Sequence, residues 1–144
     1  MVKRSKLIAM MLIGLMIFTL EQPVLARENN PKAEITPQTY NYLVTTKCFL
    51  TDSGNGVLSV TGKTKTYESV DSITTTVYLQ KNTSKGWVNV KSWTNSTNNK
   101  SSCNVKGTIT VAKGYKYRAY CHHRAEKGKS IETNTSNTKA YLVE

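Results

Sequence analysis

The chain has 144 residues, with 20 Lys and Arg against 9 Asp and Glu, and a formal net charge of +11. This length suits a single folded domain, and the positive charge favours anionic partners. The few carboxyl groups stand in or beside expected turns without the spacing of a catalytic pair, so we expect a non-catalytic protein without a cofactor.

The N-terminal residues have the pattern of an export signal. Lys3, Arg4 and Lys6 precede an apolar run over 7–20. Residues 24–26, which end with Ala26, place small residues at the usual cleavage positions. The run is shorter than the roughly 20 residues of a spanning helix, so we predict a cleaved signal peptide over 1–26 and a secreted protein with no transmembrane segment. A polar leader over 27–39 follows, and then one domain over 40–144. Residues 27–144 hold 17 basic and 8 acidic side chains, a net charge of +9.

Alternating apolar and polar residues predict strands along the whole domain. We expect strands over 40–51 and 57–66, joined by a turn over 52–56 that has two glycines for positive φ. A hairpin follows over 72–94, with a loop over 81–86. The polar run over 94–101 is predicted to be a loop. Further strands are expected over 102–111, 115–124 and 130–143, the last one broken at Ser136 and Asn137.

The hairpin over 72–94 holds both tryptophans and therefore much of the surface that the domain can bury. Period-two spacing places Val88 and Val90 on the core face. It places Tyr78, Trp87 and Trp93 on the opposite face. If that face is uncovered, they form an aromatic platform for a glycan or a protein partner; if it is covered, they form a second small core.

No helical period occurs after the signal segment, and Thr and Tyr are abundant, as suits half-buried strands. The expected fold is all-β, a seven-stranded antiparallel β-sandwich of immunoglobulin or fibronectin-III type. The tyrosine-rich run over 114–121 suits the sixth strand of such a fold. The expected second strand has no cysteine, which favours the fibronectin-III-like variant.

Three cysteines follow the signal segment: Cys48, Cys103 and Cys121. In an oxidising compartment we expect one disulfide and one free thiol, and the sequence leaves all three pairings open. Cys121 and His123 lie two apart on one strand face. They suggest an alternative function, a small secreted enzyme or inhibitor with a Cys–His nucleophile pair.

The outer face of the strand over 115–124 carries a basic stripe, which consists of Lys116, Arg118, Tyr120, His122 and Arg124. Such a row could follow an anionic polymer or stack on sugars, or it could be an ordinary solvated strand face. His122 and His123 point to opposite faces because they are adjacent on a strand, so we expect no metal site.

Three segments resemble a known family. They are Val70-Asp71-Ser72-Ile73 leading to Trp87 and Trp93, then Gly107-Thr108-Ile109-Thr110-Val111 with Lys113-Gly114-Tyr115 and Tyr117-Arg118, and then His123, Lys127-Gly128 and Glu132-Thr133. In this order they resemble a family of small secreted proteins of Gram-positive bacteria, a domain of unknown function. The resemblance covers about 57–143. It implies a small immunoglobulin-like β-sandwich and no agreed site residues.

We therefore predict a secreted, basic, non-catalytic binding module. Its expected partner is an anionic wall polymer, a glycan or another protein, and we do not expect nucleic acid. A membrane-binding effector is a further hypothesis, but the sequence lacks the amphipathic helix that such a role commonly uses.

Overall fold

A computed structural model describes residues 39–144 of the chain, so the predicted signal peptide over 1–26 and all but the last residue of the leader lie outside the described residues. The described part is all-β and antiparallel, as predicted. Its strands are β1 (Leu43–Asp52), β2 (Val57–Thr83), β3 (Gly86–Thr110), β4 (Lys116–Lys127), β5 (Ser130–Asn137) and β6 (Tyr141–Leu142).

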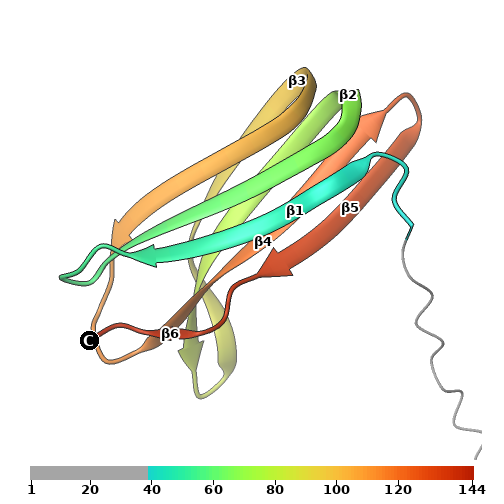
Figure 1. The fold of residues 1–144 in the computed structure, drawn as a ribbon. Helices are drawn as coiled ribbons and strands as arrows, with labels where there is room; N and C mark the ends of the chain where they lie inside the picture. The colour runs from blue at the N-terminus through green and yellow to red at the C-terminus, as the bar shows by residue number, and fades with distance from the viewer. Residues whose placement is uncertain (1–38) are drawn as a thin grey trace, which may run out of the picture. The chain divides into compact units, whose positions relative to one another are not determined.

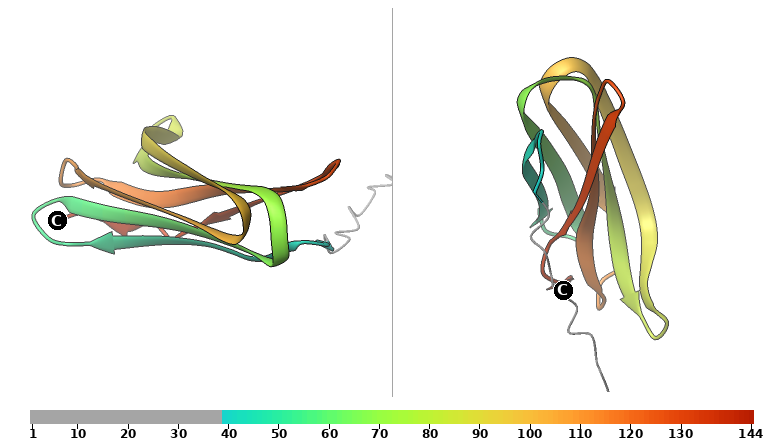
Figure 2. Two further views of the ribbon diagram at one scale, coloured as in Figure 1. Left: turned by 90° about the horizontal axis from the view of Figure 1, so that it is seen from above. Right: turned by 90° about the vertical axis from the view of Figure 1, so that its right-hand side faces the viewer.

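The fold is organised by the long hairpin of β2 and β3, whose strands have 27 and 25 residues. The first part of β2 pairs with β1 on one side and with the last part of β3 on the other. The second part of β2 pairs with β4 and with the first part of β3, and β4 in turn pairs with β5 and β6. The sheet bends between these parts, so that one half, β1–β2–β3, faces the other half, β3–β2–β4–β5 (Figure 1; Figure 2).

The space between the halves is filled by the side chains that alternation predicts to point inward. One core cluster combines Leu58 and Val60 of β2 with Val77 and Leu79 of the same strand, and with Tyr117 of β4. Every second residue of β4 from Tyr117 to Ala125 is buried, which is the pattern of a strand with one face in the core. The shared cluster holds the two halves of the bent sheet together.

The turn over 52–56 is confirmed. Gly54, Asn55 and Gly56 have φ values of 84°, 54° and 75°. At Gly56 a side chain would also meet the backbone oxygen of Val111 at 2.8 Å. Glycine is therefore needed there for its conformation and for space.

The predicted count of seven strands is wrong, because residues 39–144 form six. The expected strands over 57–66 and 72–80 are parts of one strand, β2. The expected loop over 94–101 lies within β3, where Thr94 and Ser96 pair with Thr76 and Thr74 of β2. Both pairs are also joined by side-chain hydroxyl hydrogen bonds of 2.9 Å. Polar residues are tolerated in this strand because it is exposed, so their polarity did not indicate a loop.

The predicted facing of the second hairpin strand is wrong at Trp93, although Trp87 lies on the face of Tyr78, as predicted. Val88 and Val90 are each 42% exposed, whereas Trp93 packs against the core cluster. The cause is a β-bulge: Leu79 pairs with Lys91 but Gln80 pairs with Asn89, which leaves Val90 as the extra residue. One extra residue reverses the alternation, so Trp87 and Trp93 lie on opposite faces of the sheet.

Candidate functional site

The outer face of the β3–β2–β4–β5 half brings together most of the residues that the sequence suggests for binding. Tyr78 of β2 lies opposite Tyr120 of β4, and Gln80 lies opposite Arg118. The Tyr78 and Tyr120 rings are 6.1 Å apart between centroids and tilted by 45°. Trp87 of β3 pairs with Asn82 at the same end of this face. We call this surface the aromatic face and define it by Tyr78, Trp87, Arg118, Tyr120 and His122.

Arg118 lies at the centre of the contacts on the aromatic face. Its guanidinium carbon is 4.4 Å from the centroid of the Trp87 ring, within the range of a cation–π interaction. Its Nε donates a hydrogen bond of 2.8 Å to Oε1 of Gln80, and the Gln80 amide nitrogen donates one of 2.9 Å to Asn89. These contacts fix the guanidinium in one place and leave its other N–H groups available to a ligand.

Beyond Tyr120, along β4 toward the β4–β5 turn, this side of the sheet carries polar residues. His122 pairs with Thr76, and Arg124 pairs with Thr74. Arg124 is engaged in an ion pair of 2.6 Å with Glu126, so its charge is locally compensated. Lys116, at the other end of β4, is exposed and pairs with Leu142. The five predicted stripe residues therefore share one face, and Arg118 is the only one of the Lys and Arg side chains among them that lies over an aromatic ring.

Trp93 is the predicted site residue that the structure separates from this face. Its ring lies against Gly107 of β3, where a side chain would overlap the indole. Trp93 also borders a shallow groove of about 340 Å³ whose other lining residues are Thr94, Asn95, Asn104, Val105 and Lys106. The indole thus serves mainly as part of the core edge.

The disulfide joins Cys48 of β1 to Cys121 of β4, and Cys103 is free and buried. The thiol of Cys103 donates a hydrogen bond of 3.3 Å to the backbone oxygen of Asn95. Because the sulfur of Cys121 is bonded to Cys48, it is not available as a thiolate. The alternative Cys–His pair therefore lacks its nucleophile in this structure.

His123 is fully buried, which the sequence did not indicate. Its Nδ1 is 2.7 Å from the Thr64 hydroxyl and its Nε2 is 2.8 Å from the Ser136 hydroxyl. Thr64 is in turn 2.6 Å from the hydroxyl of Thr75. Burial, with a smaller effect from the charge of His122, lowers the pKa of His123 to about 4. The ring is therefore neutral at pH 7 and completes a polar network inside the core.

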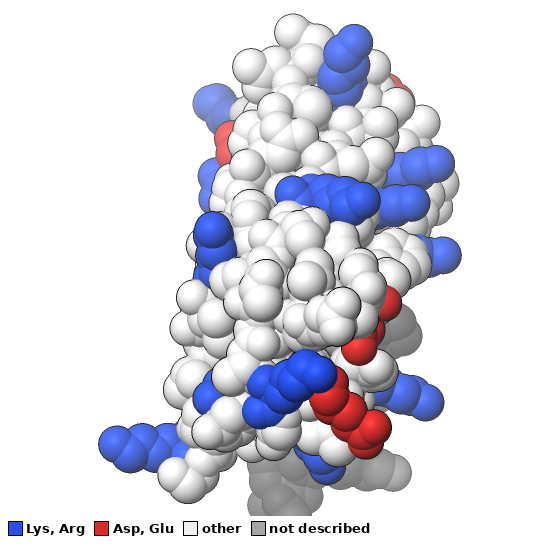
Figure 3. Space-filling view, turned by 90° about the vertical axis from the view of Figure 1, so that its left-hand side faces the viewer, with Lys and Arg blue, Asp and Glu red and all other residues white. Residues whose placement is uncertain are grey.

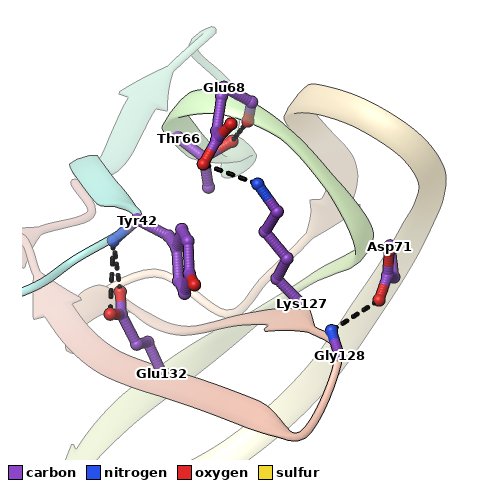
Figure 4. Close-up of polar contacts among 7 residues, drawn as sticks. All are labelled: Tyr42, Thr66, Glu68, Asp71, Lys127, Gly128 and Glu132. Atoms are coloured by element: carbon purple, nitrogen blue, oxygen red, sulfur yellow. Dashed lines mark hydrogen bonds and ion pairs between the residues drawn. The ribbon is translucent and has the colours of Figure 1, made fainter.

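Carboxylates gather at the end of the domain where β1 begins, and there they hold backbone and lysine groups (Figure 4). Lys127 forms an ion pair of 2.6 Å with Glu68, and the backbone N–H of Gly128 donates a hydrogen bond of 2.7 Å to Asp71. Glu132 accepts hydrogen bonds of 2.7–3.2 Å from the backbone N–H groups of residues 41–43. Burial alone would raise the pKa of Glu132, but these three N–H donors outweigh it and lower the pKa.

Most lysines of the described residues have no such partner. Within residues 39–144, the ion pairs involve only Arg124 and Lys127. Figure 3 shows one side of the molecule, where Lys and Arg side chains occur at many separate places and acidic side chains at few. The same range contains no group of three or more His, Cys, Asp or Glu side chains that could hold a metal ion, and no helix long and apolar enough to cross a membrane.

Comparison with known proteins gives no relative: no family model matches the chain, and searches of curated proteins and of solved structures find no match.

Proposed function

We propose that the protein is a non-catalytic binding module that recognises an acidic glycan through its aromatic face. The observation that carries this proposal is the placement of Arg118 against Trp87 and Gln80 beside the Tyr78–Tyr120 pair. One sheet face then offers ring surfaces, amide groups and one fixed positive charge side by side.

This combination suits the chemistry of a sugar that carries a carboxylate or sulfate. The apolar face of a sugar ring packs on Tyr and Trp rings, while its hydroxyls exchange hydrogen bonds with amides and hydroxyls. The guanidinium fork of Arg118 matches the geometry of an acidic group. The hydroxyl pairs Thr76–Thr94 and Thr74–Ser96 extend this hydrogen-bonding surface along the strands.

A glycan array that displays uronic-acid, sulfated and neutral oligosaccharides tests the proposal on the purified protein. We expect acidic glycans to be retained, and Trp87→Ala or Arg118→Gln to lower that retention at least ten-fold. Tyr67→Ala is a matched control, because Tyr67 is 75% exposed and lies in the bend of β2, away from the paired part of the aromatic face. Equal losses in Tyr67→Ala and Trp87→Ala, or no retention of any acidic glycan, would overturn the proposal.

We also propose that the fold is a variant of the fibronectin-III-like sandwich in which two pairs of sandwich strands have merged into β2 and β3. Two observations support it. The pairing divides into a β1–β2–β3 half and a β3–β2–β4–β5 half. The hydroxyl of Tyr117, near the start of β4, donates a hydrogen bond of 2.9 Å to the backbone oxygen of Ala112, as the tyrosine corner of immunoglobulin-like folds does.

Export is part of the same proposal. The Cys48–Cys121 disulfide supports an oxidising compartment, in agreement with the signal-like pattern over 1–26. N-terminal sequencing of the protein secreted by a Gram-positive host tests it, with Arg27 expected as the first residue. An intact N-terminus on protein that stays inside the cell would contradict it.

A further inference from the structure

The outer face of the other half, β1–β2–β3, carries a second concentration of positive charge that the basic stripe does not include. Lys47 of β1 lies directly opposite Lys63 of β2. Lys65 follows two residues along β2, and Lys106 of β3 pairs with Thr61. All four lysines are exposed. We call this surface the lysine face.

No carboxylate lies among the paired residues of the lysine face. The neighbours of its lysines on the same side of the three strands are hydroxyl, amide and aromatic residues: Thr45, Phe49, Thr51, Ser59, Thr61, Ser102, Asn104 and Thr108. Lys63 forms a cation–π contact with the Phe49 ring, whose centroid is 5.4 Å from the ammonium nitrogen. Like charges directly opposite each other on neighbouring strands destabilise a sheet, so the Lys47–Lys63 pair has an unfavourable energy without a ligand.

The usual structural reason for lysines on a sheet does not explain the two lysines of β2. Lysines on edge strands discourage pairing with other chains. Lys63 and Lys65 lie on β2, which is paired on both sides at these positions, with β1 and with β3. Their charges therefore protect no open edge.

The domain also places its carboxylates elsewhere. Asp52 accepts hydrogen bonds from the Gly54 backbone and from the Tyr141 hydroxyl. Glu68, Asp71, Glu126 and Glu132 are engaged in the ion pairs and backbone contacts already described. Five of the six acidic side chains of residues 39–144 thus interact with other groups. None of these five neutralises a lysine of the lysine face.

We propose that the lysine face binds a linear polymer that carries a phosphate group on each repeat. Residues two apart on a strand are about 7 Å apart and neighbouring strands about 5 Å, so the four ammonium groups can meet successive phosphates of one extended chain. The hydroxyl and amide groups between them supply hydrogen bonds to phosphate oxygens. A membrane surface fits less well, because Phe49 is the one exposed large apolar side chain among the paired residues of this face. This proposal does not depend on glycan binding, since the two faces belong to opposite halves of the sheet.

Binding of fluorescently labelled inorganic polyphosphate to the purified protein, measured by anisotropy between 50 and 200 mM salt, tests the proposal. Four phosphate contacts predict a slope of about −3 in a plot of log affinity against log salt, which is a loss of about fifty-fold over this range. The quadruple variant Lys47→Gln, Lys63→Gln, Lys65→Gln and Lys106→Gln should lose at least ten-fold in affinity at 100 mM salt and show a smaller slope. A double variant, Lys47→Gln with Lys63→Gln, should give an intermediate result and covers the case in which the quadruple variant does not fold.

The matched control removes the same number of charges from exposed lysines outside the lysine face: Lys85→Gln, Lys100→Gln, Lys113→Gln and Lys139→Gln. We expect its affinity to change less than three-fold. Equal losses in the two quadruple variants would overturn the proposal, because net charge alone would then explain the binding. Absence of polyphosphate binding at 50 mM salt would also overturn it, and so would binding restricted to vesicles that contain phosphatidylglycerol. None of these three results would bear on the glycan array, which reports on the aromatic face.

Discussion

Acid should destabilise this protein through His123, and the size of the effect follows from its burial. The pKa of His123 is about 4 in the fold, against 6.5 for the unperturbed group. The unfolded chain therefore binds a proton more readily than the folded protein does between these values. Stability is fully present above pH 6.5 and is lost as the pH falls toward 4. Between pH 7 and pH 4.5 the linkage relation gives a loss of about 2 kcal/mol in the free energy of unfolding.

Urea unfolding at pH 7 and at pH 4.5 measures this loss, and His123→Gln isolates the part due to the histidine. The variant should be less stable at both pH values, but the difference between them should be smaller by about 2 kcal/mol than in the unchanged protein. Glu132, whose lowered pKa also makes stability fall in acid, is present in both proteins and cancels. An NMR titration of the His123 ring gives a direct check. A midpoint near 6.5, or the same pH dependence in both proteins, would refute the reasoning.

Three further predictions concern stability. Glu132→Gln should lower the free energy of unfolding by about 1–2 kcal/mol, since a neutral amide accepts weaker hydrogen bonds from the backbone of 41–43, and chemical denaturation at pH 7 measures it. Gly107→Ala should displace the Trp93 ring and lower stability by about 1–3 kcal/mol; unchanged near-UV circular dichroism would contradict it. Replacing Cys48 and Cys121 by Ala removes a cross-link between residues 73 positions apart. The loss of loop-closure entropy should lower the free energy of unfolding by about 4 kcal/mol. A loss below 1 kcal/mol would contradict this prediction.

Period-two alternation was enough to predict an all-β antiparallel fold and the two faces of β4, because each residue's side depends only on its own parity. The aromatic face could be anticipated for the same reason: Arg118 and Tyr120 lie on one strand, and Tyr78 follows the same rule on β2. Alternation assigns the wrong face to residues beyond a β-bulge, where one strand holds an extra residue. The bulge at Val90 has no local signal in the sequence, yet it places Trp93 on the core face while Trp87 lies on the outer face.

Other features were hidden because they depend on residues far apart in the chain. Glu132 contacts residues about 90 positions away, and the partners of His123 lie on β2 and β5. Neither has a spacing that a single sequence reveals. The strand over 94–101 was missed for a different reason. Its pairing is made by backbone groups and by Thr and Ser hydroxyls, so its polar composition resembles that of a loop.

The distribution of charge connects the fold with the proposed functions. In a small domain with few carboxylates, each carboxylate can either neutralise a lysine or accept hydrogen bonds from backbone N–H groups. Here Asp71 and Glu132 hold backbone N–H groups where the first strand and the β4–β5 turn meet, and the Lys47–Lys63 pair is left without a counter-charge. The uncompensated repulsion between Lys47 and Lys63 lowers the stability of the sheet at the lysine face. On the proposal that the lysine face binds a phosphate polymer, binding offsets this repulsion, so added polyphosphate should raise the thermal midpoint of the unchanged protein more than that of the lysine-face variant.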